Sequence, residues 1–312
     1  MLSRRYLRIK VFHALYAQWQ AEDVSAARIE KELVTGIGRI HQIYLALLLT
    51  FGELRHAADL RIEERKRKRL PTPEDLDPDR RFVDDPVLRA IVEDPRLATE
   101  ATRAGISWVG HQEIFARMLR EIEQDPAHCS FMTDPDPGFR RSRAYMVHLL
   151  TEWIANSTAL QEEFESRSIH WMEDLDLAAS LVKRGIEQME PGGGIEMVEA
   201  SDDEEKEFVT GLFRSTIRYQ EEHEALVAAQ ASNWDSERIA LSDMILMQMA
   251  LTEARTFEQI PVKVTLNEYI EIAKAYSTPK SRVFINGVLD KIFIAMKADG
   301  RIRKVGRGLL ES

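Results

Sequence analysis

The stretch that decides the fold is IPVKVTLNEYIEIAKAYSTPKSRVFINGVLDKIFIAM, Ile260–Met296. It predicts two helices separated by the pair Ser277-Thr278. Thr265 and Glu268 have the spacing of a capping box, so we expect the first helix to begin at Leu266. The apolar residues of this helix recur at helical spacing and form one stripe: Leu266, Tyr269, Ile270, Ala273 and Tyr276.

The second helix is expected to begin at Pro279, with Thr278 as its N-cap, because proline suits the first helical position. Its core stripe consists of Ile285, Val288, Leu289, Ile292 and Met296. Phe284 lies off that stripe, on a line with Lys280 and Lys291. A base of single-stranded RNA can stack on such a ring while the lysines meet phosphates. The alternative, which the sequence leaves open, is that Phe284 packs under a neighbouring helix.

The order of residues in this stretch closely resembles the C-terminal signature of the NusB family of bacterial transcription antitermination factors. The matching positions are Ile260-Pro261, Lys263-Val264, Asn267-Glu268, Ala273-Lys274, Tyr276 and the run from Phe284 to Lys291. Residues 234–239 look like the start of the preceding NusB helix, and Arg4-Arg5-x-x-Arg8 looks like the family's arginine-rich first helix. The resemblance covers roughly residues 1–21 and 203–296, less than half of the chain.

This resemblance and the helical periodicity together predict an all-α fold, a NusB-like helical bundle with a large all-helical insertion. The first helix of the bundle is expected in residues 1–21, the insertion in 22–200, the rest of the bundle in 201–298 and a basic tail in 299–312. Within the insertion, helices are expected near residues 25–60, 87–103, 106–124, 140–165 and 172–189. The segment Pro191-Gly192-Gly193-Gly194 reads as a linker, and Ser201 with Glu204 forms a second capping box at the start of the next helix.

Charge is unevenly distributed along the 312 residues, whose net charge of −10 argues against a protein that coats nucleic acid indiscriminately. Residues 1–21 carry +4 and residues 274–304 carry +6, so the remainder carries −20. Two basic ends on an acidic body predict one local anion site, provided that the ends meet in the fold.

The first helix has a cationic start on its apolar face. Arg8 lies on the same stripe as Val11, Phe12 and Leu15. A guanidinium on the core line must either be paired or protrude beyond the edge of the core. We expect the N-terminal arginines (Arg4, Arg5 and Arg8) to protrude over an RNA backbone, where planar donors grip phosphate. The alternative is that these arginines form salt bridges with the acidic body.

The resemblance implies a non-enzymatic protein that binds the boxA element of nascent RNA together with NusE, a ribosomal protein, and the single cysteine fits a reducing cytoplasm. That assembly would join RNA polymerase and other Nus factors, and would suppress premature termination in rRNA operons. The RNA-binding residues carried over are Arg4, Arg5, Arg8, Lys280, Ser281 and Phe284, and the NusE-binding residues are Tyr16, Asp243 and Leu246. Lys280 stands where relatives carry an acidic residue, so RNA binding is expected to depend less on NusE.

Other functional classes have less support. Some rRNA cytosine methyltransferases carry a NusB-like domain, but such an enzyme would need a β-rich nucleotide-binding half and a catalytic cysteine that follows a proline, and neither is found in this sequence. A helical protein-interaction scaffold without RNA binding is the more credible alternative. The single cysteine, Cys129, excludes an internal disulfide, and with His128 alone it supplies no metal or nucleophile site, so no cofactor is expected.

Two further features bear on partners. No stretch approaches the roughly 18 apolar residues of a membrane helix, so no membrane association is expected. The basic run Arg61–Arg69 is either a solvated helix end or a second RNA contact.

Overall fold

The computed structural model describes residues 2–21, 23–135, 138–199, 202–230 and 239–310. Regular secondary structure in these ranges is helical throughout, which confirms the all-α prediction. The chain forms two compact units. One comprises Met1–Ile37 with Ser201–Ser312, and the other comprises Gly38–Ala200. The segment 234–238 and Ser201, which the sequence-based predictions include, lie outside the described residues.

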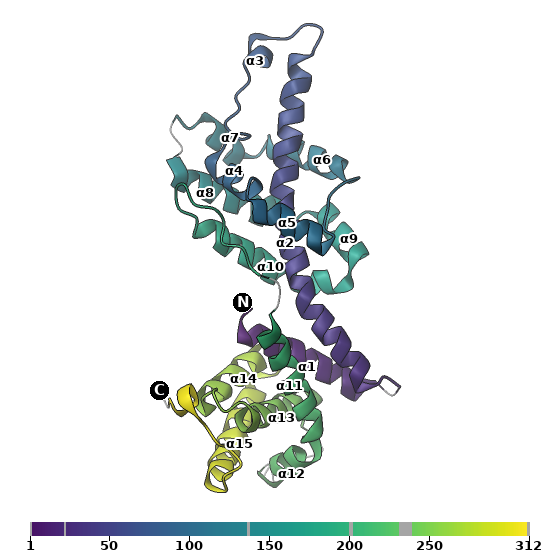
Figure 1. Ribbon diagram of the computed structural model, residues 1–312, viewed down its shortest axis with the longest axis vertical. Helices are drawn as coiled ribbons and strands as arrows, with labels where there is room; N and C mark the ends of the chain where they lie inside the picture. The colour runs from purple at the N-terminus through teal and green to yellow at the C-terminus, as the bar shows by residue number, and fades with distance from the viewer. Residues whose placement is uncertain (1, 22, 136–137, 200–201, 231–238, 311–312) are drawn as a thin grey trace. The chain divides into compact units, whose positions relative to one another are not determined.

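The first unit is built around a central helix, α13 (Leu241–Thr256), whose residues from Ile245 to Ala254 are all buried. Four other helices, shown with it in Figure 1, complete the C-terminal part of this unit: α11 (Asp203–Arg218), α12 (Gln220–Gln230), α14 (Val262–Tyr276) and α15 (Pro279–Ala298). Each of these four packs against α13. A helix that contacts neighbours on all sides is apolar all round, which explains the run MILMQMAL in α13.

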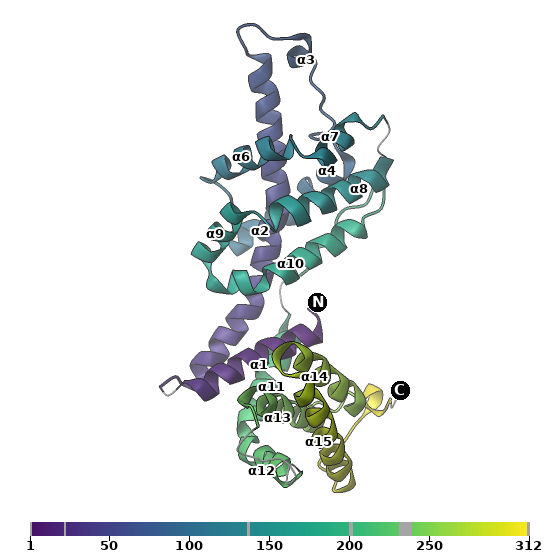
Figure 2. The same ribbon diagram turned by 180° about the vertical axis from the view of Figure 1, so that it is seen from behind.

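The first helix, α1 (Arg4–Gln20), packs against α11, α13 and α14, as Figures 1 and 2 both show. Ser3 caps it by accepting a hydrogen bond from the backbone N–H of Tyr6. The apolar side chains Leu7, Val11, Phe12 and Leu15 are buried, and each such burial contributes roughly 1.5–3 kcal/mol. The expected return of the first helix onto the C-terminal helices is therefore confirmed.

The two helices of the Ile260–Met296 stretch follow the sequence prediction unequally. α15 begins at Pro279, Thr278 accepts a hydrogen bond from the N–H of Ser281 at 3.2 Å, and the whole predicted core stripe is buried. The predicted start of α14 at Leu266 is wrong, because the helix begins at Val262 and Thr265 lies inside it. The Thr265 hydroxyl donates instead to buried Glu253 at 2.8 Å, so tertiary contacts use the residue that the capping box would need.

The start of α11 also differs from its sequence prediction. The helix begins at Asp203, and its N-cap is Asp202, whose carboxylate accepts a hydrogen bond from the N–H of Glu205 at 2.7 Å. The predicted cap, Ser201, belongs to the residues that are not described. Asp203, Glu204 and Glu205 in the first turn suit the positive end of the helix dipole.

The second unit packs shorter helices around the later part of α2 (Ala26–Lys66), whose early part belongs to the first unit. These helices are α3 (Pro73–Leu76), α4 (Pro86–Val92), α5 (Pro95–Ala104), α6 (Gln112–Ile122), α7 (Pro126–Thr133), α8 (Gly138–His148), the π-helical turn Leu149–Ile154, α9 (Thr158–Arg167) and α10 (Ile169–Glu187). The predicted helix 87–103 is divided into α4 and α5, because Asp94 caps a new helix that begins at Pro95. The helices predicted at 106–124 and 140–165 are shorter or divided, α7 was not predicted, and α10 nearly matches the predicted range 172–189.

Although α2 is long and apolar enough to cross a membrane, 67% of its most apolar window is buried inside the protein. Its buried side chains include Tyr44, Leu48 and Phe51, which belong to the core of the second unit. A buried core helix accounts for this composition.

Candidate nucleic-acid interface

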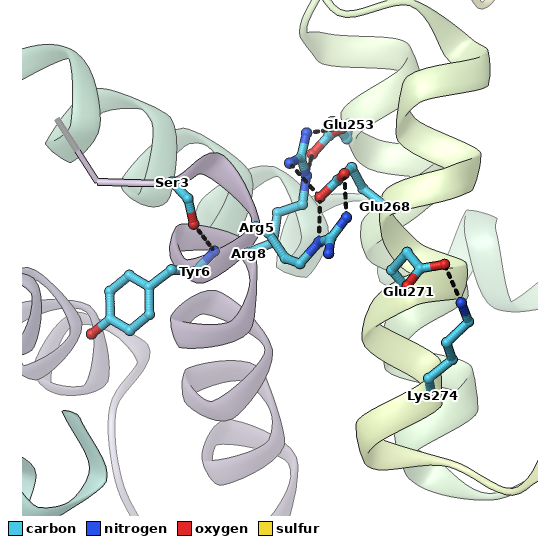
Figure 3. Close-up of polar contacts among 8 residues, drawn as sticks. All are labelled: Ser3, Arg5, Tyr6, Arg8, Glu253, Glu268, Glu271 and Lys274. Carbon is cyan, nitrogen blue, oxygen red and sulfur yellow. Dashed lines mark hydrogen bonds and ion pairs between the residues drawn. The ribbon is translucent and has the colours of Figure 1, made fainter. Parts of the chain in front are cut away.

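Arg8 is buried, with only 3% of its side chain exposed, and it pairs with Glu253 of α13. Its Nε donates to Oε2 at 2.7 Å and its Nη2 donates to Oε1 at 2.8 Å, as Figure 3 shows. Burial alone would lower the pKa of Arg8, but the charge and hydrogen bonds of Glu253 raise it, so the guanidinium stays cationic. The expectation that Arg8 protrudes is therefore wrong. A charge on the core line is stable here because a carboxylate is buried with it.

Glu253 is the centre of this buried network. Besides the two bonds from Arg8, it accepts hydrogen bonds from the Thr265 hydroxyl at 2.8 Å and the Tyr269 hydroxyl at 3.3 Å. The network joins α1, α13 and α14. This network is not among the sequence-based predictions, although a glutamate inside the apolar run of α13 is a signal that a buried cation must lie nearby.

Arg5 lies one turn before Arg8 and reaches Glu268 of α14 (Figure 3). Its Nε and Nη2 donate to the two carboxylate oxygens at 2.9 and 2.8 Å, while 46% of the Arg5 side chain stays exposed. One oxygen of Glu268 also lies 3.6 Å from Nη1 of Arg8. The hydrogen bonds of Glu268 raise the pKa of Arg5. Because exposed ion pairs are weak, Arg5 can exchange this carboxylate for a phosphate at low cost.

Arg4 completes the set of N-terminal arginines. It pairs with Glu204 of α11, and its guanidinium carbon lies 4.5 Å from the centre of the Phe208 ring. All three arginines therefore have carboxylate partners within the first unit, which is the alternative that the sequence left open. Their RNA-binding role stays a prediction.

The residues expected on α15 differ in their exposure. Lys280 is exposed in the first turn, and Ser281 is half-buried with its hydroxyl 2.9 Å from that of Thr278. Phe284 is only 8% exposed, so the prediction that it lies on a face free of the core is wrong. Three helices, α12, α13 and α14, pack against α15, so more of its circumference is buried than the predicted stripe. The buried side of the helix includes Phe284 and Phe293. A base can stack on Phe284 only after its side chain moves outward.

The two basic ends of the sequence meet around Glu271 of α14. Lys274 pairs with this carboxylate, and the hydrogen bond from Lys274 lowers its pKa, with further contributions from the charges of Arg5 and Arg282. These cations come from α14, α1 and the first turn of α15. The first unit has 21 basic and 22 acidic residues, a net charge of −1, whereas residues 38–200 carry −9. Most of the chain's negative charge therefore belongs to the second unit.

The three residues expected to bind NusE are placed differently from one another. Tyr16 is 41% exposed on α1. Asp243 is buried and accepts a hydrogen bond from the Ser277 hydroxyl, and Leu246 is fully buried in α13. In this structure only Tyr16 of the three is available to a partner. The sequence could not show this, because α13 is apolar on every side and has no periodicity from which to read a buried face.

A hollow of about 1370 Å³ lies beside the N-terminal arginines. Its walls come from the start of α1, the start of α11, the loop between α13 and α14, and residues Arg307 and Leu310 of the C-terminal tail. This hollow has no local sequence signal, because its walls are far apart in the chain.

Other sequence-level candidates are accounted for locally. In the basic run, Arg61 pairs with Glu123 at 2.7 Å and Lys68 pairs with Asp75 at 2.8 Å, while RNA contact there stays a prediction. Cys129 is exposed. Within the described ranges, no group of His, Cys, Asp and Glu side chains could hold a metal ion.

Comparison with known proteins places the chain in a family. The NusB family model matches residues 140–293. Three similar proteins are each named transcription antitermination protein NusB. The one from Salinibacter ruber is 46% identical over 105 residues, 34% of this chain and 66% of that protein. The one from Chloroherpeton thalassium is 40% identical over 106 residues, 34% and 50% of the two chains.

The third relative, from Bacillus mycoides, is 36% identical over 105 residues, 34% of this chain and 81% of that protein. The chain thus spans between half and four fifths of the length of these relatives. No solved structure matches the chain. The family model, the identities and the helical bundle agree: this chain belongs to the NusB family.

Proposed function

We propose that this protein is a transcription antitermination factor that binds boxA-type RNA together with the ribosomal protein NusE. The complex would act with RNA polymerase and other Nus factors to suppress premature termination in rRNA operons. In this proposal, residues 1–21 and 201–298 form the NusB-like bundle, residues 22–200 are an insertion and residues 299–312 are a basic tail. The protein would act in the cytoplasm, without catalysis.

The observation that carries this proposal is the meeting of the two basic ends of the chain around Glu271. Lys274 pairs with Glu271, the charges of Arg5 and Arg282 help to lower the pKa of that carboxyl, and exposed Lys280 lies in the same first turn of α15 as Arg282. Phosphates of a single strand can replace exposed carboxylates as partners of these cations, because both groups are anions whose oxygens accept hydrogen bonds from arginine and lysine. A local cationic surface on a bundle of near-zero net charge favours a specific RNA contact over general coating.

One alternative function keeps support from a specific observation. Each of the N-terminal arginines is already paired with a carboxylate, and Phe284 is buried. A helical protein-interaction scaffold that does not bind RNA would have the same contacts. The two proposals differ in whether the exposed pair Arg5–Glu268 opens to RNA.

Fluorescence anisotropy with a short boxA RNA and a scrambled RNA, with and without the cognate NusE, tests the proposal. We expect a preference for boxA that tightens with NusE, and weaker binding in Arg5→Gln and Lys280→Glu. Measurements at two salt concentrations count the phosphate contacts, because each contact contributes to the salt dependence. Equal and weak binding of both RNAs would leave the scaffold function. Unchanged affinity in Lys280→Glu would remove Lys280 from the site.

A further inference from the structure

The C-terminal tail, residues 299–310, follows α15 and lies beyond the residues that the NusB family model matches. It folds back onto the first unit. Ile302 is 7% exposed, and its N–H donates to the carbonyl of Met296 at 3.0 Å. The N–H of Val305 donates to the carbonyl of Glu258 at 3.1 Å, in the loop between α13 and α14. Figure 2 shows the end of the tail beside α14.

Two residues make this docking specific. Gly308 lies so close to the loop that a Cβ atom there would be 1.9 Å from the carbonyl oxygen of Glu258, so any larger residue displaces the tail. Lys304 extends inward and donates from Nζ to the carbonyl oxygen of Phe257 at 2.9 Å. These contacts give the tail a specific docking position on the loop between α13 and α14.

The docked tail presents cations outward. Residues 300–310 contain four basic residues and no acidic residue. Arg301 pairs with Glu222 and Asp299, whereas Arg303 and Arg307 are exposed and form no ion pair with any residue in the described ranges. Of these last two, Arg307 lines the hollow that the N-terminal arginines also line, and Arg303 does not.

We propose that the docked tail is an additional RNA-binding element, in which Arg307 binds a phosphate of the strand that crosses the hollow from Arg5. This inference rests on the proposed function. The ion pairs favour this proposal. Arg4, Arg5 and Arg8 are paired with Glu204, Glu268 and Glu253, respectively. Arg307 is the arginine at the hollow that has no carboxylate partner among the described residues. Four carboxylates, Glu204, Glu207, Glu258 and Glu268, also line the hollow and repel phosphate, so a phosphate contact is expected only at Arg307 and at the exposed edge of Arg5.

The test is anisotropy of the full chain with a boxA RNA extended by several nucleotides at each end, over a range of salt concentrations. We expect Arg307→Gln to weaken binding by about threefold to tenfold and to reduce the salt slope by about 0.7, the value for one phosphate contact of a single strand. Arg303→Gln is the matched control, because it removes the same charge from the same tail but away from the hollow. It should leave the affinity within about 1.5-fold of wild type.

Gly308→Val tests the docking itself. It should undock the tail, seen as faster hydrogen exchange at Val305, and weaken RNA binding as Arg307→Gln does. Equal losses in Arg303→Gln and Arg307→Gln, or no loss in Arg307→Gln, would overturn the proposal. An Arg307→Gln variant that binds RNA normally but binds NusE less well would overturn it in favour of a protein segment in the hollow.

The tail inference can fail while the proposed function stands. If wild type binds boxA and Arg5→Gln does not, the proposed function stands whatever the tail variants show. If wild type has no preference for boxA, both proposals fail together.

Discussion

Replacing Glu253 by glutamine tests whether the buried pair with Arg8 holds α1 on the bundle. Glutamine has nearly the same shape but no charge, and one of its two acceptors becomes an N–H₂ donor. The Arg8 guanidinium, 3% exposed, would then have no buried negative charge beside it. One of its two N–H donors would lie against the N–H₂ group of the glutamine and would lose its hydrogen bond. Glu268, 3.6 Å away, is too far to replace both bonds.

The expected loss of stability is large. Removal of one partner from a buried ion pair costs roughly 3–5 kcal/mol, because the other charge stays buried without compensation. The Thr265 and Tyr269 hydroxyls also lose part of their acceptor. We expect Glu253→Gln to destabilise the first unit by about 4 kcal/mol, a large fraction of the roughly 5–15 kcal/mol of a typical domain. Replacement of both partners, in Arg8→Met with Glu253→Met, should cost less than Glu253→Met alone.

A chain with two compact units does not unfold in one step, so a single global free energy is not suitable. Hydrogen exchange by mass spectrometry in increasing urea gives local free energies instead. Peptides from α1, α13 and α14 should lose protection in Glu253→Gln, while peptides from α6 and α10 in the second unit serve as an internal control. A loss below about 1 kcal/mol in α1, or additive losses in the double variant, would refute the role given to this pair.

Three other predictions concern the same unit. Glu268→Gln should free Arg5 and raise boxA affinity by about threefold at low salt, measured by anisotropy, and an equal or lower affinity would mean that Glu268 orients Arg5 for RNA. Burial lowers the pKa of His223 from 6.5 to about 4, so the unfolded state takes up the proton first as pH falls. The first unit should then lose roughly 2 kcal/mol between pH 7.5 and pH 5, and His223→Gln should remove that slope in hydrogen exchange. Leu246→Ala should cost roughly 2–5 kcal/mol of stability, whereas Tyr16→Ala should leave exchange unchanged and weaken only NusE binding in a titration.

The sequence predicts helices best where the local signal and the tertiary structure agree. α15 begins at Pro279 as predicted, because its cap is local: the Thr278 side chain accepts a hydrogen bond from the N–H of Ser281, three residues later. The start of α14 was misplaced by four residues, from Val262 to Leu266. An earlier start only adds one turn before the same apolar residues, so their periodicity does not reveal where the helix begins. Thr265 and Glu268 have capping-box spacing, yet their partners are Glu253 and Arg5 on other helices.

The charge pattern predicted which basic residues are available for the candidate site, but the sequence did not predict how the residues of the site are arranged or buried. The charge pattern indicated that both basic ends are available for one site, and charges from both ends, Arg5 and Arg282, help to lower the pKa of Glu271. The sequence could not show that Phe284 is buried, because the width of the buried arc on α15 depends on how many helices pack against it. The hollow and the docking position of the tail were also not predictable, because they depend on contacts between Glu258 and residues near Gly308.

Arg8 and Arg5, one turn apart on α1, have different roles: Arg8 stabilises the fold, and Arg5 is available to bind RNA. Arg8 is buried with Glu253 and cannot leave it without a large loss of stability, whereas Arg5 is half exposed and its pair with Glu268 is easily exchanged. Because Glu268 also lies near Arg8, the buried network fixes the position of the carboxylate that Arg5 uses. Arg5→Gln should therefore weaken RNA binding with unchanged hydrogen exchange, and Arg8→Gln should first destabilise α1. If Arg8→Gln weakened RNA binding while α1 kept its protection, Arg8 would have to leave Glu253 for RNA, and the division of roles along the helix would be wrong.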